Sequence, residues 1–214
     1  MDTIVERYNK IKSNINNDEV NIVAVSKMFT LDHIMPLVDH GHLHFGENKV
    51  QEAESKWKNI MKTNKNLKLH MVGKLQSNKA KKAVEVFDFI HSLDNQKLAD
   101  GLKKSEINMN KKLKYFIQVN VGNENQKSGI PASELDSFYT YCKNEIDLDI
   151  IGLMSLPPNN VSPDKYFKYL YEANTSLALK DLSIGMSSDY KKAVEYKSTY
   201  VRIGSLLFGE RPNI

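Results

Sequence analysis

The feature of this sequence that most constrains its fold is a repeated alternation between short apolar runs and longer segments with helical spacing. The short runs are rich in β-branched and aromatic residues, which is typical of strands buried on both faces of a sheet. The longer segments place apolar residues three and four positions apart, as one face of an amphipathic helix does. The alternation therefore predicts parallel strands joined by helices. The expected strands are residues 22–25, 43–48, 68–73, 89–93, 115–121, 148–154, 181–186 and 200–209.

Eight expected strands, each but the last followed by a helix, fit the 214 residues into one α/β domain spanning 1–214. The count and the size indicate a single (β/α)8 TIM barrel. A doubly wound open sheet is the alternative, because the number of strands decides between the two. An extra helix is expected ahead of the first strand, at residues 2–16. Thr30 is expected to cap a helix that runs to about His40, and Pro131 to open another. Ser162 is expected to cap a third, with Pro163 in the first helical position.

The composition predicts a globular chain. Hydrophobic residues make up 41% of the sequence, enough for a full core, and the apolar runs fall well short of the about 20 residues of a transmembrane helix. The first residues contain no apolar signal core, so we expect a cytoplasmic protein with no membrane partner. The single cysteine, Cys142, allows no internal disulfide and has no metal-ligand spacing around it, so packing on a helix is its expected role.

The net charge of +4 raises the question of nucleic-acid binding, which depends on basic residues clustered on one face. Lysine pairs such as Lys81-Lys82 and Lys191-Lys192 are scattered among acidic residues on expected helices. This pattern favours solvated helix surfaces over an anion-binding patch. We therefore expect no nucleic-acid partner.

Lys27 follows the first strand directly and is the first candidate for chemistry. Ligands of α/β barrels collect at the carboxyl ends of the strands, and a lysine amine there can attack a carbonyl compound to form a Schiff base. The alternative is a solvated lysine that begins a loop. Only a neutral amine attacks, and loss of solvent at a barrel mouth favours that form.

Two glycine-containing stretches suggest what Lys27 would meet. Residues 185–189 lead from the seventh strand into a short helix, and Gly204-Ser205 lies within the segment assigned to the eighth. The recurrent phosphate site of a barrel is built from the loops after these two strands. Each glycine taken alone could be ordinary turn chemistry. Together with a lysine across the barrel mouth they suggest a phosphorylated aldehyde.

Several motifs, in order along nearly the whole chain, resemble the pyridoxal 5′-phosphate homeostasis protein family. They are Ala24-Val-Ser-Lys27, Phe45-Gly-Glu-Asn48, His70-Met-Val-Gly-Lys-Leu-Gln-Ser-Asn78, His91-Ser-Leu-Asp94, Gly152-Leu-Met154, Ser183-Ile-Gly-Met-Ser187 and Arg202-Ile-Gly-Ser205. The resemblance implies a barrel similar to the N-terminal domain of alanine racemase that holds pyridoxal 5′-phosphate (PLP) as an aldimine.

The resemblance also implies which residues bind the cofactor. Lys27 matches the cofactor lysine, and the phosphate-binding positions are matched by Ser187, Gly204 and Ser205.

Three more positions are carried over from the family. Arg202 matches the arginine that faces the pyridine nitrogen, Asn48 a residue near the ring, and Met186 a residue that lines the pocket. Two positions depart from the family pattern: Lys49 stands where tyrosine is more frequent, and Lys197 where glycine is common. The first departure lies close to the cofactor loop, and the second is expected in a surface turn.

The expected function is that of a non-catalytic PLP carrier or regulator in vitamin B6 homeostasis, with effects on amino-acid metabolism. A guanidinium at Arg202 would disfavour protonation of the pyridine nitrogen and weaken the ring as an electron sink. The resemblance implies a similar arginine in alanine racemases, so this feature does not exclude catalysis. Alanine racemases also use a second, β-rich domain and a tyrosine base from a partner subunit, and the sequence ends soon after the eighth strand. No catalytic residue is therefore assigned. PLP-dependent apo-enzymes are candidate recipients, and a monomer is expected because no extra apolar stripe is left over.

Two alternative functions stay open, and nucleic-acid binding ranks last. A PLP-dependent amino-acid racemase would use Lys27 as its catalytic lysine. A Schiff-base lyase on the same barrel would work without the cofactor. His44, His70 and His91 lie near strands, and one of them could act as an acid or base, although packing in the core or along the pocket is the more frequent role.

Overall fold

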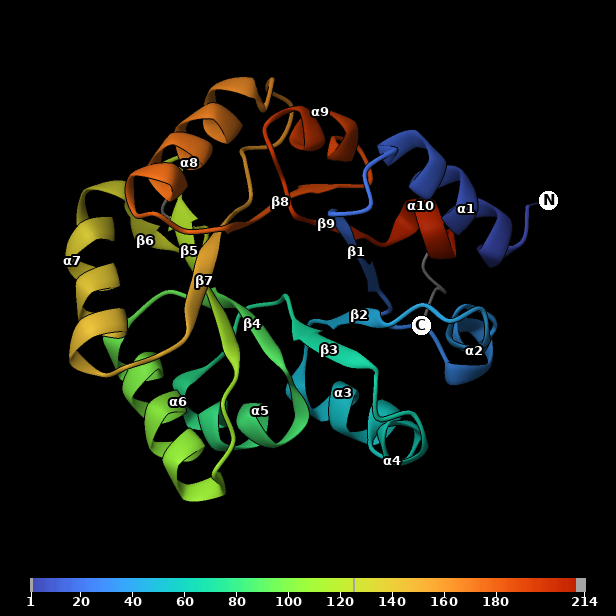
Figure 1. The fold of residues 1–214 in the computed structure, drawn as a ribbon, viewed down its shortest axis with the longest axis horizontal. Helices are drawn as coiled ribbons and strands as arrows, with labels where there is room; N and C mark the ends of the chain where they lie inside the picture. The colour runs from blue at the N-terminus through green and yellow to red at the C-terminus, as the bar shows by residue number, and fades with distance from the viewer. Residues whose placement is uncertain (1, 125, 211–214) are drawn as a thin grey trace.

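The computed structural model describes residues 2–124 and 126–210, which form a ring of parallel strands surrounded by helices (Figure 1). The strands are β1 (Asn21–Val25), β2 (His44–Glu47), β3 (Lys68–Met71), β4 (Phe89–Leu93), β5 (Lys114–Asn120), β6 (Ile130–Pro131), β7 (Ile150–Ser155), β8 (Asp181–Met186) and β9 (Tyr200–Ile203). The ring follows the order β1-β2-β3-β4-β5-β7-β8-β9, and β9 pairs with β1. The (β/α)8 barrel is confirmed, and the open sheet is excluded.

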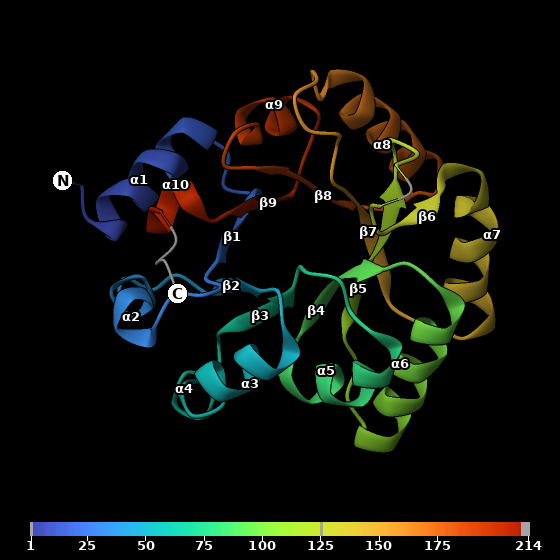
Figure 2. The same ribbon diagram turned by 180° about the vertical axis from the view of Figure 1, so that it is seen from behind.

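The helices lie on the outside of this ring, as the view from behind also shows (Figure 2). They are α1 (Ile4–Ile15), α2 (Leu31–Asp39), α3 (Val50–Trp57), α4 (Ile60–Thr63), α5 (Ala80–Val86), α6 (Gln96–Met109), α7 (Leu135–Thr140), α8 (Asp164–Ser176), α9 (Tyr190–Glu195) and α10 (Ser205–Phe208). The extra helix ahead of β1 is confirmed as α1. It begins in a capping box, in which the Thr3 side chain accepts from the Glu6 N–H and the Glu6 side chain accepts from the Thr3 N–H.

Side chains along each strand alternate between the barrel interior and the helix layer, as the two-residue period of a strand requires. In β1, Ile22 and Ala24 pack in the large core beneath the helices, whereas Val23 belongs to a separate cluster. That second cluster fills the barrel interior. Its buried members are Val23, Phe89, Phe116, Met154 and Tyr200.

Two strand expectations need correction. The predicted eighth strand ends at Ile203, because Gly204 breaks the pattern and Ser205–Phe208 forms the helix α10. The apolar residues of α10, Leu207 and Phe208, are buried under α1 and α2. In the sequence they continue the apolar run of the strand, which is why a longer strand was predicted. The two-residue strand β6, which pairs with β5, was not predicted because it is too short for a periodicity to register.

The helix start predicted at Pro131 is wrong, because Pro131 ends β6 and α7 begins at Leu135 after a 3-10 turn at Ala132–Glu134. The other two starts were predicted within about one residue. Thr30 is the residue before α2, and Leu31 begins the helix. At α8 the helix begins at Asp164, so Pro163 takes the cap position instead of the first helical one. The expected Ser162 cap is therefore wrong by one residue, because the Ser162 hydroxyl bonds to the Asp164 carboxylate.

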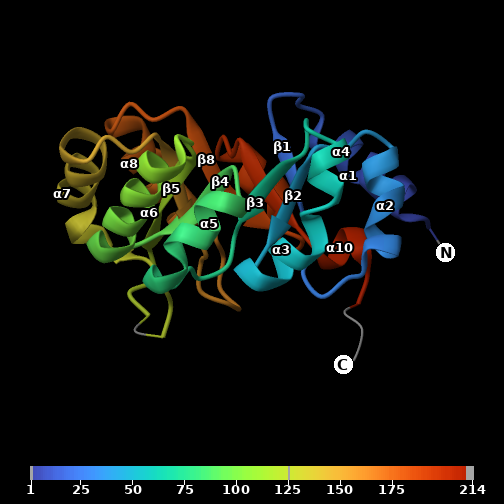
Figure 3. The same ribbon diagram turned by 90° about the horizontal axis from the view of Figure 1, so that it is seen from below.

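The loops after β5 and β7 project together from one end of the barrel (Figure 3). They are joined by Lys127, whose Nζ donates to the Pro157 carbonyl oxygen at 2.8 Å. Since the strands are parallel, this end is where all their carboxyl termini open.

Candidate functional site

The seven predicted cofactor-binding residues lie at the carboxyl ends of four strands that are neighbours in the ring. In the order β8-β9-β1-β2, they are Met186 and Ser187; Arg202, Gly204 and Ser205; Lys27; and Asn48. The strand register pairs Arg202 with Met186 on one side and with Val23 on the other. The prediction that strand ends gather these residues at one side of the barrel mouth is therefore consistent with the structure.

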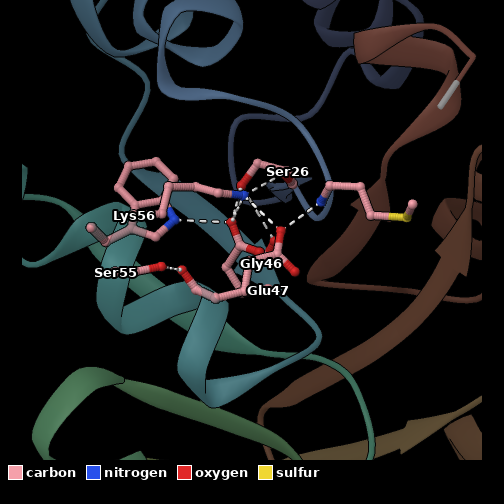
Figure 4. Close-up of polar contacts among 8 residues, drawn as sticks. Ser26, Gly46, Glu47, Ser55 and Lys56 are labelled. Carbon is pink, nitrogen blue, oxygen red and sulfur yellow. Dashed lines mark hydrogen bonds and ion pairs between the residues drawn. The ribbon is translucent and has the colours of Figure 1, made fainter. Parts of the chain in front are cut away.

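Lys27 is half-buried in the turn that follows β1. The residue before it is held by side chains from β2 and α3 (Figure 4). The Lys56 Nζ donates to the Ser26 carbonyl oxygen at 2.9 Å, and the Ser26 hydroxyl donates to Glu47 Oε1 at 2.7 Å. Ser26, which leads into Lys27, is thus held by hydrogen bonds at both its backbone carbonyl and its side chain.

Glu47 is the centre of this cluster. Its side chain points out of the barrel towards α3 and is fully buried, and its Oε1 also accepts from Lys56 Nζ and from Trp57 Nε1, each at 2.9 Å. The Lys56 side chain is only 9% exposed. A buried carboxylate is tolerated when it is paired and hydrogen-bonded, as Oε1 is here, whereas the buried Oε2 has no hydrogen-bond partner among the described residues.

The residue after Lys27 is held by the same helix. The Met28 N–H donates to Glu52 Oε1 at 2.6 Å, and Glu52 pairs with Lys56 at 3.0 Å. Met28 has a φ of +67°, in the left-handed region. The strained turn at Lys27 is therefore anchored to α3 on both sides, a contact that the sequence analysis missed.

The loops after β8 and β9 contact each other. Gly185, the next-to-last residue of β8, has a φ of +93°, and the Met186 N–H that follows it donates to Asp189 Oδ1 at 2.6 Å. The Leu206 N–H donates to Ser187 Oγ at 3.3 Å, which joins the two loops. This arrangement brings serine hydroxyls and backbone N–H groups to one place, where an anion could be bound.

A cavity of about 1230 Å³ opens beside these loops, between α1, α9 and α10. Its lining includes Ser187 and Ser205 together with the basic side chains of Arg7, Lys10 and Lys192. The lining also includes the acidic residues Asp2, Asp189, Glu195 and Glu210, so its charges are mixed, and Ser187 and Ser205 are accessible from this cavity.

Arg202 is a buried cation that faces neutral acceptors. Its side chain is in the barrel interior and the residue is 5% exposed. Nη1 donates to the Ser183 carbonyl oxygen at 2.7 Å and to Ser183 Oγ at 2.6 Å, and Nη2 donates to the Ser155 carbonyl oxygen at 2.9 Å. Burial lowers the pKa of Arg202 to about 10, so the guanidinium stays charged at neutral pH.

Asn48 is half-buried, directly after β2, and lies against the end of β3. A Cβ on Gly73 would lie 2.5 Å from the Asn48 carbonyl oxygen and 2.8 Å from its Cα. Only glycine permits this close approach of the two strand ends. Gly73 is thus the residue that sets the position of the Asn48 backbone.

Both departures from the family pattern lie at the surface. Lys49 is exposed and occupies the residue before α3. Lys197 is exposed in a turn with a φ of +63°, a conformation that glycine adopts most readily, so the expected surface turn is confirmed.

The three histidines near strands prove to be connected. His44 contacts His70, His70 contacts His91, and His91 contacts Ser183, the partner of Arg202. Sequence reasoning placed them in the core or pocket but missed the chain. The sequence did contain a signal for this contact. Side chains alternate along a strand, and the three histidines occupy strand positions that all face the barrel interior.

Metal binding finds no support in the part of the chain that is described. Among residues 2–124 and 126–210, no group of three or more His, Cys, Asp or Glu is arranged to hold a metal ion. Cys142 is buried, and burial raises the pKa of its thiol to about 12, which fits a packing role. None of the helices in the described ranges is long and apolar enough to cross a bilayer.

The residues present fit a phosphorylated aldehyde of the PLP type. Lys27 supplies an amine at the barrel mouth, the Ser187 and Ser205 loops supply anion-binding groups, and Arg202 supplies a positive charge that neutral oxygens leave uncancelled. Such a set can hold an aldehyde, a phosphate and a ring nitrogen at neighbouring strand ends.

Comparisons with known proteins agree with this geometry. The family model described as "Alanine racemase, N-terminal domain" matches residues 1–212, which defines the class of barrel. Alanine racemase from Clostridium difficile 630 has the same fold, with a TM-score of 0.79 at 14% identity, over 100% of this chain and 58% of that one.

Relatives of similar length identify the family of this chain more specifically. The pyridoxal phosphate homeostasis protein of Aquifex aeolicus is 34% identical, covering 97% of this chain and 95% of that protein, and that of Vibrio cholerae is 38% identical over 90% and 86%. PipY of Synechococcus elongatus, in a structure with PLP bound, superposes with a TM-score of 0.88 at 33% identity, over 96% of this chain and 100% of that one. The chain belongs to the pyridoxal phosphate homeostasis protein family.

Proposed function

We propose that this chain binds PLP through a covalent bond to Lys27 and acts in PLP homeostasis as a carrier or regulator rather than as an enzyme. The observation that carries the proposal is the placement of Lys27, Arg202 and the Ser187 and Ser205 loops on the ends of three adjacent strands. The relatives named for PLP homeostasis and the PLP-bound PipY structure support it.

Each part of the site has a distinct task. PLP would supply an aldehyde, with which the Lys27 amine would condense to a C=N bond with release of water. Ser187, Gly204 and Ser205 would bind the phosphate, while Asn48 and Met186 would lie along the ring. The hydrogen bonds that Lys56 and Glu47 form with Ser26 hold the turn that presents Lys27.

Arg202 bears on how strongly a bound pyridine ring would be activated. A guanidinium has five N–H donors and no acceptor, so it can donate to an unprotonated pyridine nitrogen but opposes a protonated one. An unprotonated ring is a poor sink for carbanion electrons. The resemblance implies a similar arginine in alanine racemases, so Arg202 does not by itself exclude racemisation, and the relatives named for PLP homeostasis favour the carrier. A stereochemical assay of free amino acids, with alanine first, tests this, and racemisation that depends on Lys27 would contradict the carrier.

The cofactor proposal is tested by titrating the purified protein with PLP and following the visible absorption of the C=N bond. The wild type and Lys49→Ala, which alters an exposed lysine near the same loop, should develop the band. Lys27→Ala should not develop it, although the phosphate loops would still bind PLP weakly. An equal band in Lys27→Ala would show that another lysine is the partner.

The cellular setting is also proposed. We infer a monomer in the cytoplasm that passes PLP to apo-enzymes that depend on it. Sedimentation of the PLP-loaded protein tests the first point. Transfer of PLP to an apo-enzyme, faster than release into a large excess of a PLP trap, tests whether delivery is direct.

A further inference from the structure

A chain of four hydrogen bonds crosses the barrel interior from Arg202 to His44. The Arg202 Nη1 lies 2.6 Å from Ser183 Oγ, which lies 2.8 Å from His91 Nδ1. His91 Nε2 lies 2.9 Å from His70 Nδ1, and His70 Nε2 lies 2.9 Å from His44 Nδ1. The chain connects β9, β8, β4, β3 and β2, and it ends at the first residue of β2, at the end of the barrel opposite Lys27.

Arg202 determines the direction of this chain. A guanidinium can only donate, so Ser183 Oγ must accept from it. The single proton of the Ser183 hydroxyl then points to its other neighbour, His91 Nδ1. His91 must therefore carry its proton on Nε2 and donate to His70, and His70 must do the same towards His44.

The opposite direction is disfavoured on two grounds. It would make Arg202 and His91 both donate to Ser183 Oγ and leave the hydroxyl proton without an acceptor in a fully buried position. A buried donor without a partner costs about 1–3 kcal/mol. Each reversed dipole would also point its positive end at the guanidinium, whereas the assigned direction aligns all of them favourably with the charge.

The surroundings keep the imidazoles neutral. His70 and His91 are fully buried, and His70 stacks on Phe89 while His91 stacks on Phe116, with centroid distances of 4.2 and 4.3 Å. Burial lowers the pKa of both histidines well below the usual range, and at His91 the charge of Arg202 adds to this effect. A ring protonated on both nitrogens would in addition point its Nδ1–H at the donor group of its neighbour, which leaves that donor without an acceptor.

The chain also explains how Arg202 keeps an uncancelled charge. No carboxylate in the described ranges forms an ion pair with it, and its partners are the oxygens of Ser183 and Ser155. A serine hydroxyl that donates to an imidazole becomes a stronger acceptor. The three histidines thereby strengthen the bond that orients the guanidinium.

We propose that His44, His70 and His91 are held as neutral Nε2–H tautomers, and that Ser183 and His91 are positioning residues that orient Arg202 towards the pyridine end of the cofactor. The orientation of Arg202 towards the cofactor rests on the proposed function. The histidine tautomers and the contact between Ser183 and Arg202 do not depend on cofactor binding.

The first test is nitrogen NMR of the uniformly ¹⁵N-labelled protein without PLP. His44, His70 and His91 should each show an unprotonated Nδ1 and a protonated Nε2 at neutral pH. A protonated Nδ1 on His91 would overturn the assigned direction, and a positively charged His70 or His91 would do the same. This test needs no substitution and is independent of cofactor binding.

The second test is Ser183→Ala, with Ser176→Ala on the exposed face of α8 as the control. Loss of one hydrogen bond to a charged group should speed hydrogen exchange of the Arg202 guanidinium by at least about 10-fold. Ser176→Ala should leave it unchanged. With ¹⁵N-labelled PLP bound, the ring nitrogen should be unprotonated in the wild type and shift towards the protonated form in Ser183→Ala.

The outcomes separate the two proposals. Unchanged Arg202 exchange in a folded Ser183→Ala protein overturns the positioning role. If Ser183→Ala does not fold, the wild-type tautomers still decide the direction of the chain. If Lys27 fails to bind PLP while the tautomers and the exchange behave as expected, the proposed function fails and the hydrogen-bond chain stands.

Discussion

The ammonium group of Lys56 lies 2.9 Å from the carbonyl oxygen of Ser26, the residue immediately before the proposed cofactor lysine. Lys56 is on α3 and Ser26 follows β1, so a helix on the outside of the barrel holds the turn that presents Lys27. The same ammonium group pairs with the buried Glu47. The stability of the barrel and the geometry of the site therefore depend on one cluster.

Lys56→Met should destabilise the protein strongly. It removes one partner of a buried pair and leaves the Glu47 carboxylate with fewer donors, which lowers the free energy of unfolding by about 3–5 kcal/mol. Urea denaturation measures the loss. Lys58→Met, which removes an exposed lysine 3.9 Å from Glu54, is the control and should cost less than about 0.5 kcal/mol. Equal losses in the two variants would contradict the importance of the cluster.

Ser187→Ala should weaken the binding of PLP but not of pyridoxal, which lacks the phosphate. A hydrogen bond to a charged group contributes about 1.5–3 kcal/mol, so the affinity for PLP should fall about 10-fold or more. Equilibrium dialysis of both ligands measures the difference. The exposed neighbour Ser188 offers a matched variant, Ser188→Ala, with a smaller expected change. A parallel loss for both ligands would place Ser187 away from the phosphate.

Gly73→Ala should displace Asn48, because the added methyl group would lie 2.5 Å from the Asn48 carbonyl oxygen. Such overpacking costs about 1–3 kcal/mol of stability. The affinity for PLP should also fall, and more than in Asn48→Ala, since the backbone moves as well as the side chain. Thermal unfolding and PLP titration of the two variants test this, and an unperturbed Gly73→Ala protein would refute it.

Stability should decrease as the pH falls from about 6.5 to about 4. His42 is buried, and burial lowers its pKa from 6.5 to about 4, so over this range the unfolded state binds a proton that the folded state does not. The slope of unfolding free energy against pH is then positive, and His42 alone accounts for about 3 kcal/mol lost on acidification.

Urea titrations at a series of pH values check this, and His42→Phe should reduce the slope by up to one proton. His44, His70 and His91, whose pKa values are also lowered by burial, should contribute in the same direction. A stability that stays constant between these pH values would contradict their neutral, buried state.

Much of the fold could be predicted because the strands carry their own pattern. An unbroken run such as Ile22 to Val25 predicts a strand without knowledge of its neighbours, and the position of Lys27 just beyond it follows directly. The α10 helix was missed although Gly204 and Ser205 offered a start signal, since Leu206, Leu207 and Phe208 continued an apolar run.

The contacts that hold the site could not be predicted in the same way. Glu47 and Lys56 are close in the sequence, but their pairing depends on how α3 packs on β2. His91 and Ser183 are 92 residues apart and meet only because the barrel closes. Periodicity indicates which face a side chain occupies, and only closure of the sheet decides which side chains meet across the interior.

The most direct test of the central claim is borohydride reduction of the PLP-loaded protein followed by mass mapping of its peptides. Reduction should convert the C=N bond into a stable amine and leave the added pyridoxyl phosphate on Lys27, at close to one per chain. A modification spread over several surface lysines, or placed on another single lysine, would contradict the assignment of Lys27 as the residue that holds the cofactor.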